Sequence, residues 1–170
     1  MRVLSLVLVS LLFLPCQGFA NFSAQVVGVI DGDSIKVLNE GKEEKIRLVG
    51  IDCPENKQSF GRRAKEFTSA QSFGKKVLVR DSGRDRYGRT LAEVILPDGR
   101  SLNKELLKAG LAWWFRKYSH DVSLKTLETD ARMKKRGLWA EVNPIPPWDY
   151  RKAESKTNKA KNNKFYQKNP

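Results

Sequence analysis

The sequence predicts an α+β fold, a small β-barrel with helices between and after its strands. Five short stretches are rich in β-branched or alternating apolar residues and are separated by turn signals. Three longer stretches place apolar residues at helical spacing, and a glycine follows each of them. With 170 residues, the chain is long enough for one domain with a hydrophobic core. Short strands combined with a few helices in this order favour a barrel.

Residues 1–20 have the pattern of a secretory signal peptide. Arg2 is their only charge, an apolar run follows from Val3 to Leu14, and Gly18 and Ala20 are small residues at the −3 and −1 positions. A membrane anchor is the alternative, but the run is short for a membrane span. We therefore expect cleavage after Ala20 and a secreted or periplasmic protein.

The five strands are predicted from β-branched residues and the turns between them. They are expected over residues 22–30, 34–38, 44–51, 75–81 and 89–96. Asp31-Gly32-Asp33 is a turn signal, and Asn39-Glu40-Gly41 closes a hairpin because its glycine can take a positive φ. In the third strand, Ile46 and Leu48 can face a core while Arg47 points away from it.

The three helices are predicted over residues 59–73, 101–109 and 122–136. Apolar residues recur at helical spacing in each stretch, and Gly74, Gly110 and Gly137 follow as stop signals. Ser101 can cap the second helix, because its hydroxyl can accept a hydrogen bond from a free backbone N–H of the first turn.

The C-terminal segment differs in composition from the rest. Prolines interrupt it from Pro144 onward, and residues 151–170 hold seven Lys or Arg against one Glu. Such a segment buries too little apolar surface to fold, although it can add non-specific attraction to a polyanion. We therefore expect a signal peptide over 1–20, a folded domain over 21–142 and a disordered basic tail over 143–170.

The charge balance favours a polyanionic partner. Lys and Arg number 32 against 19 Asp and Glu, a formal net charge of +13. Such an excess is typical of proteins that bind nucleic acid or an anionic membrane surface. A membrane-surface protein would need a basic amphipathic helix with bulky apolar anchors, which the sequence lacks.

Carboxylates and arginines follow the first strand in a pattern that suits phosphate chemistry. Asp33 and Asp52 can ligate a hard divalent cation, and Glu55 is a candidate to activate water. Arg47 and Arg89 lie on or at the edge of strands, and a guanidinium fork matches phosphate geometry. Taken singly, each residue has an alternative role in a turn or on the surface. Taken together, they favour a site for a cation and a phosphodiester.

Histidine and disulfide chemistry are disfavoured. His120 is the only histidine, so nucleases that use a histidine base or a His/Cys zinc site have little to build on. Loss of the signal peptide removes Cys16 and leaves Cys53 as the only cysteine, so we expect no internal disulfide.

Four motifs follow one another along the chain. They are Val29-Ile30-Asp31-Gly32-Asp33-Ser34, Ile46-Arg47-Leu48-Val49-Gly50-Ile51-Asp52-Cys53-Pro54-Glu55, Asp85-Arg86-Tyr87-Gly88-Arg89 and Gly110-Leu111-Ala112. Together, in this order, they resemble the staphylococcal nuclease (thermonuclease) family. The resemblance runs from about Ala24 to Trp139, which is nearly the whole predicted domain.

The resemblance implies a five-stranded OB-fold barrel with three helices and a Ca²⁺-dependent nuclease. The expected substrates are DNA and RNA, single-stranded or locally opened, cleaved with little sequence specificity. Water attacks phosphorus and the 5′-oxygen leaves, which gives 3′-phosphate ends. We expect a monomer with no stable membrane association after signal cleavage. The alternative is a non-catalytic nucleic-acid-binding module of the same family, which would be expected to have lost some site residues.

The family's functional residues carry over at matching positions. Asp33 and Asp52 match the calcium carboxylates. Arg47 and Arg89 match the arginines that hold the phosphate and stabilise the developing charge. Glu55 matches the glutamate that acts on the attacking water.

Two further positions correspond to family positions, one of them with a different residue type. Cys53 falls where the staphylococcal type has threonine, at a position that supplies a backbone carbonyl to the metal. The carbonyl survives this change but the side-chain hydroxyl does not. Tyr87 matches a tyrosine near the phosphate pocket, which makes it a candidate substrate-binding residue.

Overall fold

The protein is described here from a computed structural model that covers residues 21–168, with side chains described as far as Lys159. The predicted signal peptide, residues 1–20, lies outside the described residues. Within residues 21–168, none of the helices combines the length and the apolar character that crossing a bilayer requires.

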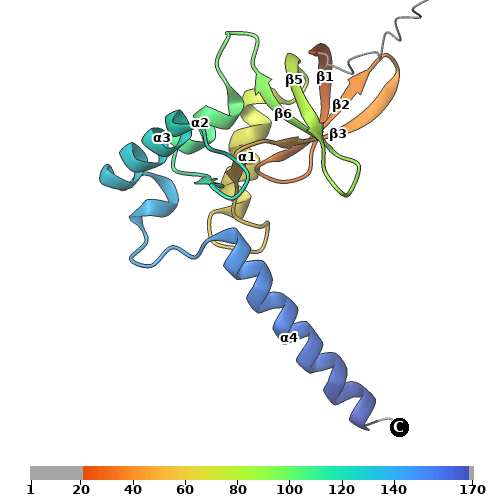
Figure 1. The fold of residues 1–170 in the computed structure, drawn as a ribbon, viewed down its shortest axis with the longest axis vertical. Coiled ribbons are helices and arrows are strands. Elements are labelled where there is room, and N and C mark those ends of the chain that lie inside the picture. The colour runs from red at the N-terminus through yellow and green to blue at the C-terminus, as the bar shows by residue number, and fades with distance from the viewer. Residues whose placement is uncertain (1–20, 169–170) are drawn as a thin grey trace, which may run out of the picture.

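Five strands close into a barrel (Figure 1). They are β1 (Phe22–Val29), β2 (Ser34–Asn39), β3 (Lys42–Leu48), β5 (Lys76–Arg84) and β6 (Thr90–Ile95). Their order around the barrel is β1-β2-β3-β6-β5, with β5 pairing back to β1. β3 and β6 run parallel, and the other neighbours run antiparallel. The predicted α+β barrel of OB type is therefore confirmed.

The hairpin between β2 and β3 forms where the turn signal predicted it. Asn39 pairs with Lys42, which leaves a two-residue loop. Glu40 and Gly41 both have positive φ, 48° and 79°. Two positive φ values match the right-handed twist of the flanking strands, as in a type I′ turn.

Three helices pack beside the barrel (Figure 1). They are α1 (Gly61–Ser72), α2 (Leu102–Lys108) and α3 (Val122–Met133), followed by the 3₁₀ turn η1 (Gly137–Ala140). The Ser101 side chain accepts a hydrogen bond from the backbone N–H of Lys104, which confirms the predicted cap of α2.

The predicted third strand, residues 44–51, is in fact two strands. β3 ends at Leu48, and a separate strand, β4 (Ile51–Asp52), pairs with β7 (Trp113–Trp114). The break occurs at Gly50, whose φ of 77° is incompatible with an extended strand. As a result, Asp52 lies outside the barrel sheet, and its carboxylate accepts a hydrogen bond from Arg47.

The core fills the barrel and continues under the helices. Ile35, Ile46, Val79, Val94 and Leu106 are fully buried in it. Burying one such aliphatic side chain stabilises a fold by about 1.5–3 kcal/mol relative to leaving it exposed. This core fixes the strand ends that carry the predicted site residues.

The C-terminal segment contains a helix, where the composition predicted disorder. α4 spans Pro147–Lys168 and projects from the domain as one long helix (Figure 1). Proline suits a first helical position, and Asp149 in the first turn complements the helix dipole. Trp148 attaches this end: its ring stacks on Phe115 at 5.4 Å and meets Trp113 edge-on at 5.6 Å. Composition alone does not reveal this single tryptophan anchor, although residues 151–159 are exposed, as their polarity suggests.

Candidate active site

One cavity of about 880 Å³ contains every site residue predicted from the sequence. It is bordered by the β1–β2 turn, the segment after β3 and the loop between β5 and β6. The predicted site residues that line it are Asp33, Arg47, Asp52, Cys53, Glu55, Tyr87 and Arg89.

The β1–β2 turn carries Asp33 into this cavity. Oδ1 of Asp31 accepts a hydrogen bond from the backbone N–H of Asp33 at 3.1 Å, which confirms Asp31 as a turn residue. Gly32 lets the turn approach its neighbours closely, because a Cβ there would lie 2.7 Å from the Cβ of Cys53 and 2.8 Å from the Cβ of Ala64. Asp33 is thereby placed against Cys53.

Asp33 is buried and strongly held. Its Oδ2 accepts the backbone N–H of Cys53 at 2.5 Å and lies 2.9 Å from Nη1 of Arg47. Burial raises the pKa of Asp33 to about 7, while the Arg47 guanidinium acts in the opposite direction. A bound cation would likewise favour the charged carboxylate, because opposite charge lowers the pKa of an acid.

Arg47 lies between the two predicted metal carboxylates. Besides the contact with Asp33, its Nη2 donates to Oδ1 of Asp52 at 2.8 Å. Its Nη1 donates to the carbonyls of Leu48 and Ile51 at 3.0 and 3.1 Å. Removing one partner of such a buried pair typically costs about 3–5 kcal/mol, because the other charge is left uncompensated. Arg47 therefore links the end of β3 to β4.

Arg89 is oriented by a carboxylate that the sequence reasoning did not single out. Its Nε donates to Oδ2 of Asp85 at 2.7 Å, and Oδ1 of Asp85 accepts the backbone N–H groups of Tyr87 and Arg89 at 2.9 and 3.0 Å. Slight burial of Asp85 raises its pKa, but the hydrogen bonds from Arg89 and Tyr87 outweigh this effect and lower it. Neither Nη atom of Arg89 has a partner among the described residues, so both are available to a phosphate.

Tyr87 lies at the outer edge of the cavity and is 69% exposed. The guanidinium of Arg89 lies 5.7 Å from its ring centroid, and that of Arg86 lies 4.8 Å away. An exposed ring beside cations can stack with a nucleobase, and the substrate-binding role of Tyr87 stays a prediction.

Glu55 projects from the segment just after β4. Its backbone N–H donates to Oε1 of Gln58 at 3.2 Å, and Nε2 of Gln58 donates to the carbonyl of Ile145 at 2.6 Å. These bonds tie the Glu55 segment to the chain that leads into α4.

A third arginine reaches this site, and the sequence reasoning missed it. Nη2 of Arg151 lies 2.8 Å from Oδ2 of Asp52, and its Nη1 lies 2.7 Å from Oε1 of Glu55. It comes from the first turns of α4, within the segment predicted to be disordered. The sequence signal for this helix was the run Pro146-Pro147-Trp148 just before Arg151. It combines a proline that can start a helix with an apolar residue that can anchor it.

The donor set fits a hard cation with few protein ligands. Asp33 and Asp52 are 5% and 1% exposed, and the predicted third ligand is the backbone carbonyl of Cys53. Within residues 21–168, His, Cys, Asp and Glu side chains form no cluster of three or more suited to a metal. Oxygen ligands from water or substrate would therefore complete the shell of about six to eight that Ca²⁺ takes. Burial raises the pKa of the Cys53 thiol well above its usual value, and the nearby Asp33 carboxylate acts in the same direction.

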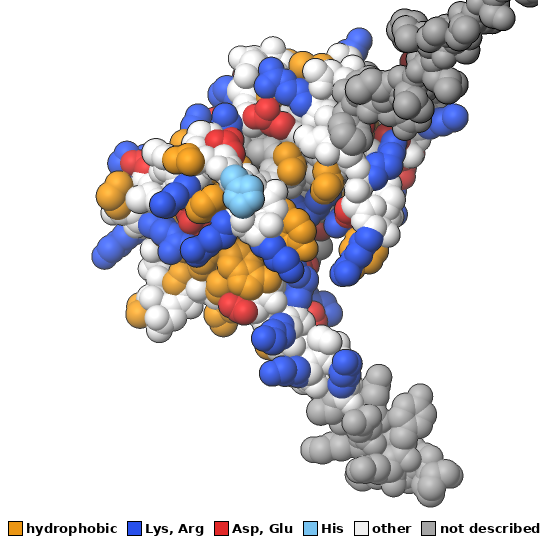
Figure 2. Space-filling view, viewed as in Figure 1, with side chains coloured by type: hydrophobic (Ala, Val, Ile, Leu, Met, Phe, Trp, Pro, Cys, Tyr) orange, Lys and Arg blue, Asp and Glu red, His pale blue; other side chains and the backbone are white. Residues whose placement is uncertain are grey.

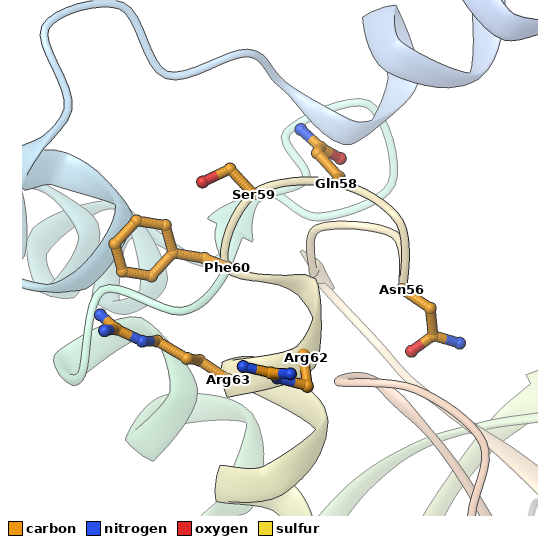
Figure 3. Close-up of a pocket in the computed structure, with 6 residues that line it drawn as sticks. All are labelled: Asn56, Gln58, Ser59, Phe60, Arg62 and Arg63. Atoms are coloured by element: carbon orange, nitrogen blue, oxygen red, sulfur yellow. The ribbon is translucent and has the colours of Figure 1, made fainter.

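A second cavity, of about 510 Å³, lies along the loop into α1 (Figure 3). Its lining is polar, basic and aromatic, with no carboxylate: Asn56, Gln58, Ser59, Phe60, Arg62 and Arg63. Figure 3 shows Phe60 and Arg63 extending to the same side, and the Arg63 guanidinium lies 5.1 Å from the ring centroid. Because it lacks acids, this cavity cannot supply the predicted chemistry.

Comparisons with known proteins place this chain among nucleases. Residues 45–141 match the family model described as "Staphylococcal nuclease homologue". An "Uncharacterized endonuclease" of Escherichia coli O157:H7 is 44% identical over 132 residues, which cover 78% of this chain and 86% of that protein. The "Micrococcal nuclease" of Shigella flexneri is 35% identical over 152 residues, covering 84% of this chain and 87% of its own length. The residues of this chain that match the family model end at 141, before α4, so Arg151 lies outside the match.

Proposed function

This chain belongs to the staphylococcal nuclease family of phosphodiester hydrolases, and from that premise we propose that it is an exported, Ca²⁺-dependent nuclease acting on DNA and RNA. One observation carries the proposal. Two buried carboxylates, a water-activating candidate and two strand-edge arginines line a single cavity of about 880 Å³. Phosphodiester hydrolysis needs this combination of charge compensation, water activation and positioning.

Asp33, Asp52 and the Cys53 carbonyl would hold the cation. A bound Ca²⁺ offsets negative charge on the scissile phosphate and helps to orient it. The Arg47 contacts fix the spacing of the two carboxylates before substrate arrives.

Glu55 and Arg89 act on the substrate. Glu55 accepts a proton from the water that attacks phosphorus, a step that typically contributes about 10²–10⁴-fold in rate. The Nη atoms of Arg89, which have no partner among the described residues, compensate charge on the phosphate oxygens as the new P–O bond forms. Arg47, whose Nη atoms hold the two metal carboxylates, adds a second positive charge beside them. The bond from phosphorus to the 5′-oxygen breaks, its electron pair stays on that oxygen, and a proton completes the 5′-hydroxyl. The products end in 3′-phosphate and 5′-hydroxyl.

The alternative is a non-catalytic member that only binds nucleic acid. Such a domain has no requirement to keep Glu55, Arg47 and Arg89 in one cavity with both metal carboxylates. Here all five are present and line the same space. This co-location favours the enzyme over the binding module.

Incubation of single-stranded DNA and of RNA with the protein in Ca²⁺ tests the proposal. We expect both polymers to be cut at many sequences and the fragments to carry 3′-phosphate, detected as ends that resist 3′-extension until a phosphatase is added. Fragments with 5′-phosphate and 3′-hydroxyl would contradict the assigned leaving group, and an absence of fragments would favour the binding module.

Export is the second part of the proposal, and the signal-like pattern of residues 1–20 supports it. Expression of the whole chain in a Gram-negative host should give periplasmic or extracellular protein that begins at Asn21. Intact Met1 on protein that stays in the cytoplasm would contradict it. One chain supplies every residue of the proposed site, so a monomer suffices for activity.

A further inference from the structure

Arg151 occupies oxygens that the proposed chemistry needs. Its two Nη atoms face Asp52 as a fork, with Nη2 2.8 Å from Oδ2 and Nη1 3.3 Å from Oδ1. Nη1 also donates to Oε1 of Glu55 at 2.7 Å. Asp52 is 1% exposed, and its Oδ1 already accepts a bond from Arg47 at 2.8 Å. Both oxygens of this carboxylate are therefore taken by guanidinium groups.

The position of Arg151 is fixed by packing around the start of α4. Trp148, three residues earlier, stacks on Phe115 with an interplanar angle of 4°. Gln58 holds the Ile145 carbonyl, and Ser59 donates to Glu141, so the loop that carries Glu55 and the segment before α4 are joined twice. Figure 2 shows hydrophobic side chains gathered where α4 leaves the domain, with Lys and Arg side chains around them and along the helix. Arg151 is thus presented to the site from an anchored helix end.

Asp52 accepts two N–H groups on Oδ1 and one on Oδ2, so of its roughly four lone-pair sites about one remains for a cation while Arg151 is bound. A carboxylate oxygen that ligates a metal cannot keep a short hydrogen bond from a donor in the metal's place, and two cations side by side repel each other. We propose that Arg151 is a positioning residue that competes with the divalent cation for Asp52 and holds Asp52 and Glu55 in place while the cation is absent. This inference rests on the proposed function, because it needs the cation site at Asp33 and Asp52.

Competition between Arg151 and the cation has a thermodynamic consequence that a purely structural ion pair lacks. If Arg151 and the cation exclude each other, each weakens the binding of the other by the same factor. Removal of Arg151 must then tighten cation binding, even though it loosens α4. A structural pair that lies outside the metal's place would leave cation affinity unchanged, or would weaken it through disorder of Asp52.

Ca²⁺ titration of the full chain by calorimetry, without nucleic acid, tests the inference. We expect Arg151→Ala to lower the Kd for Ca²⁺ by about tenfold, within the usual range of such couplings. Arg151→Gln, which keeps the side-chain bulk, should do the same, and Arg151→Lys should fall between Arg151→Gln and wild type.

Lys152→Ala is the matched control. It removes one positive charge from the next position of α4, where the exposed side chain has no contact with Asp52 or Glu55 among the described residues. We expect its Ca²⁺ Kd to change by less than about twofold, because salt screens exposed charges. Thermal melting with and without Ca²⁺ gives a second readout. The Ca²⁺-induced rise in Tm should be larger for Arg151→Gln than for wild type, because tighter binding stabilises the folded state more.

The outcomes separate this inference from the proposed function. If wild type binds no Ca²⁺, or if Asp52→Asn binds it as well as wild type, the metal assignment fails and the inference fails with it. If wild type binds Ca²⁺ through Asp52 but Arg151→Ala and Arg151→Gln bind it no more tightly, the inference is overturned and the metal assignment stands. An equal gain in Ca²⁺ affinity in Lys152→Ala would show that the effect comes from the overall positive charge of α4, and would also overturn the inference.

Discussion

Asp85 and Arg89 form a pair in which the carboxylate holds both the backbone and the side chain of the arginine. One oxygen accepts the backbone N–H of Arg89 at 3.0 Å, and the other accepts its Nε at 2.7 Å. This arrangement leaves the two Nη atoms of Arg89 without a partner among the described residues. We therefore expect Asp85 to act on the proposed reaction by orienting Arg89.

Asp85→Ala should lower kcat by about tenfold or more, because a misplaced catalytic group loses much of its effect. Steady-state kinetics on single-stranded DNA measure this. Asp98→Ala is the control, since Asp98 makes the same two contacts to Arg100, at 3.1 and 2.8 Å, on an exposed turn outside the cavity. An equal loss of kcat in both variants would show that the loss does not come from the orientation of Arg89, and would contradict this prediction.

Arg89→Ala should lose more than Asp85→Ala, about 10²–10³-fold in kcat, which is the usual loss on removing a donor that stabilises transition-state charge. The fold should persist, because the Arg89 side chain is 30% exposed and its ion pair is at the surface. Kinetics beside a thermal melt check both statements. Turnover of Arg89→Ala near that of wild type would show that Arg89 does not take part in the reaction.

Gly32→Ala should destabilise the protein and weaken Ca²⁺ binding. The added methyl group would overlap the side chains of Cys53 and Ala64, and overpacking of this kind costs about 1–3 kcal/mol. Relief requires the β1–β2 turn to shift, and Asp33 shifts with it. Gly28→Ala is the control, because its nearest neighbour is the flexible side chain of Lys36 at 3.2 Å. Unchanged Ca²⁺ affinity in Gly32→Ala would show that the close approach of the turn does not position Asp33.

Most of this site was predictable because its residues sit in short motifs on strands and turns. The alternation of Ile46, Arg47 and Leu48 places the arginine on the face away from the core, and the turn at Asp31 has a local hydrogen bond. Such signals depend on neighbours in sequence. The break at Gly50 was missed because its apolar neighbours read as a continuous strand, and only pairing with the distant β7 reveals it.

Arg151 was beyond sequence reasoning for a different reason. Its contacts to Asp52 and Glu55 span 99 and 96 residues, and its helix has no apolar stripe to predict where it packs. One tryptophan among polar residues determines the position of the helix start. Composition averages over the segment and therefore conceals that residue.

Removal of residues 155–170 should weaken binding of long substrates more at low salt than at high salt. This truncation deletes five lysines and keeps Arg151, so it separates the charge of the tail from the contact at Asp52. Each phosphate neutralised contributes about −0.7 to the slope of log K against log salt on single strands. Binding to long single-stranded DNA over a salt series, measured in a Glu55→Gln background, tests this. A loss independent of salt would assign a structural role to the tail.

The most direct test of the account is hydrolysis of single-stranded DNA by wild type and Glu55→Gln, each in Ca²⁺ and in excess chelator. We predict rapid cleavage by wild type in Ca²⁺, none in chelator, and a loss of about 10²-fold or more in Glu55→Gln. Calorimetry should show that Glu55→Gln still binds Ca²⁺, because Asp33 and Asp52 are intact. Full wild-type cleavage in chelator, or near-wild-type cleavage by Glu55→Gln, would contradict a cation-dependent reaction in which Glu55 activates the water.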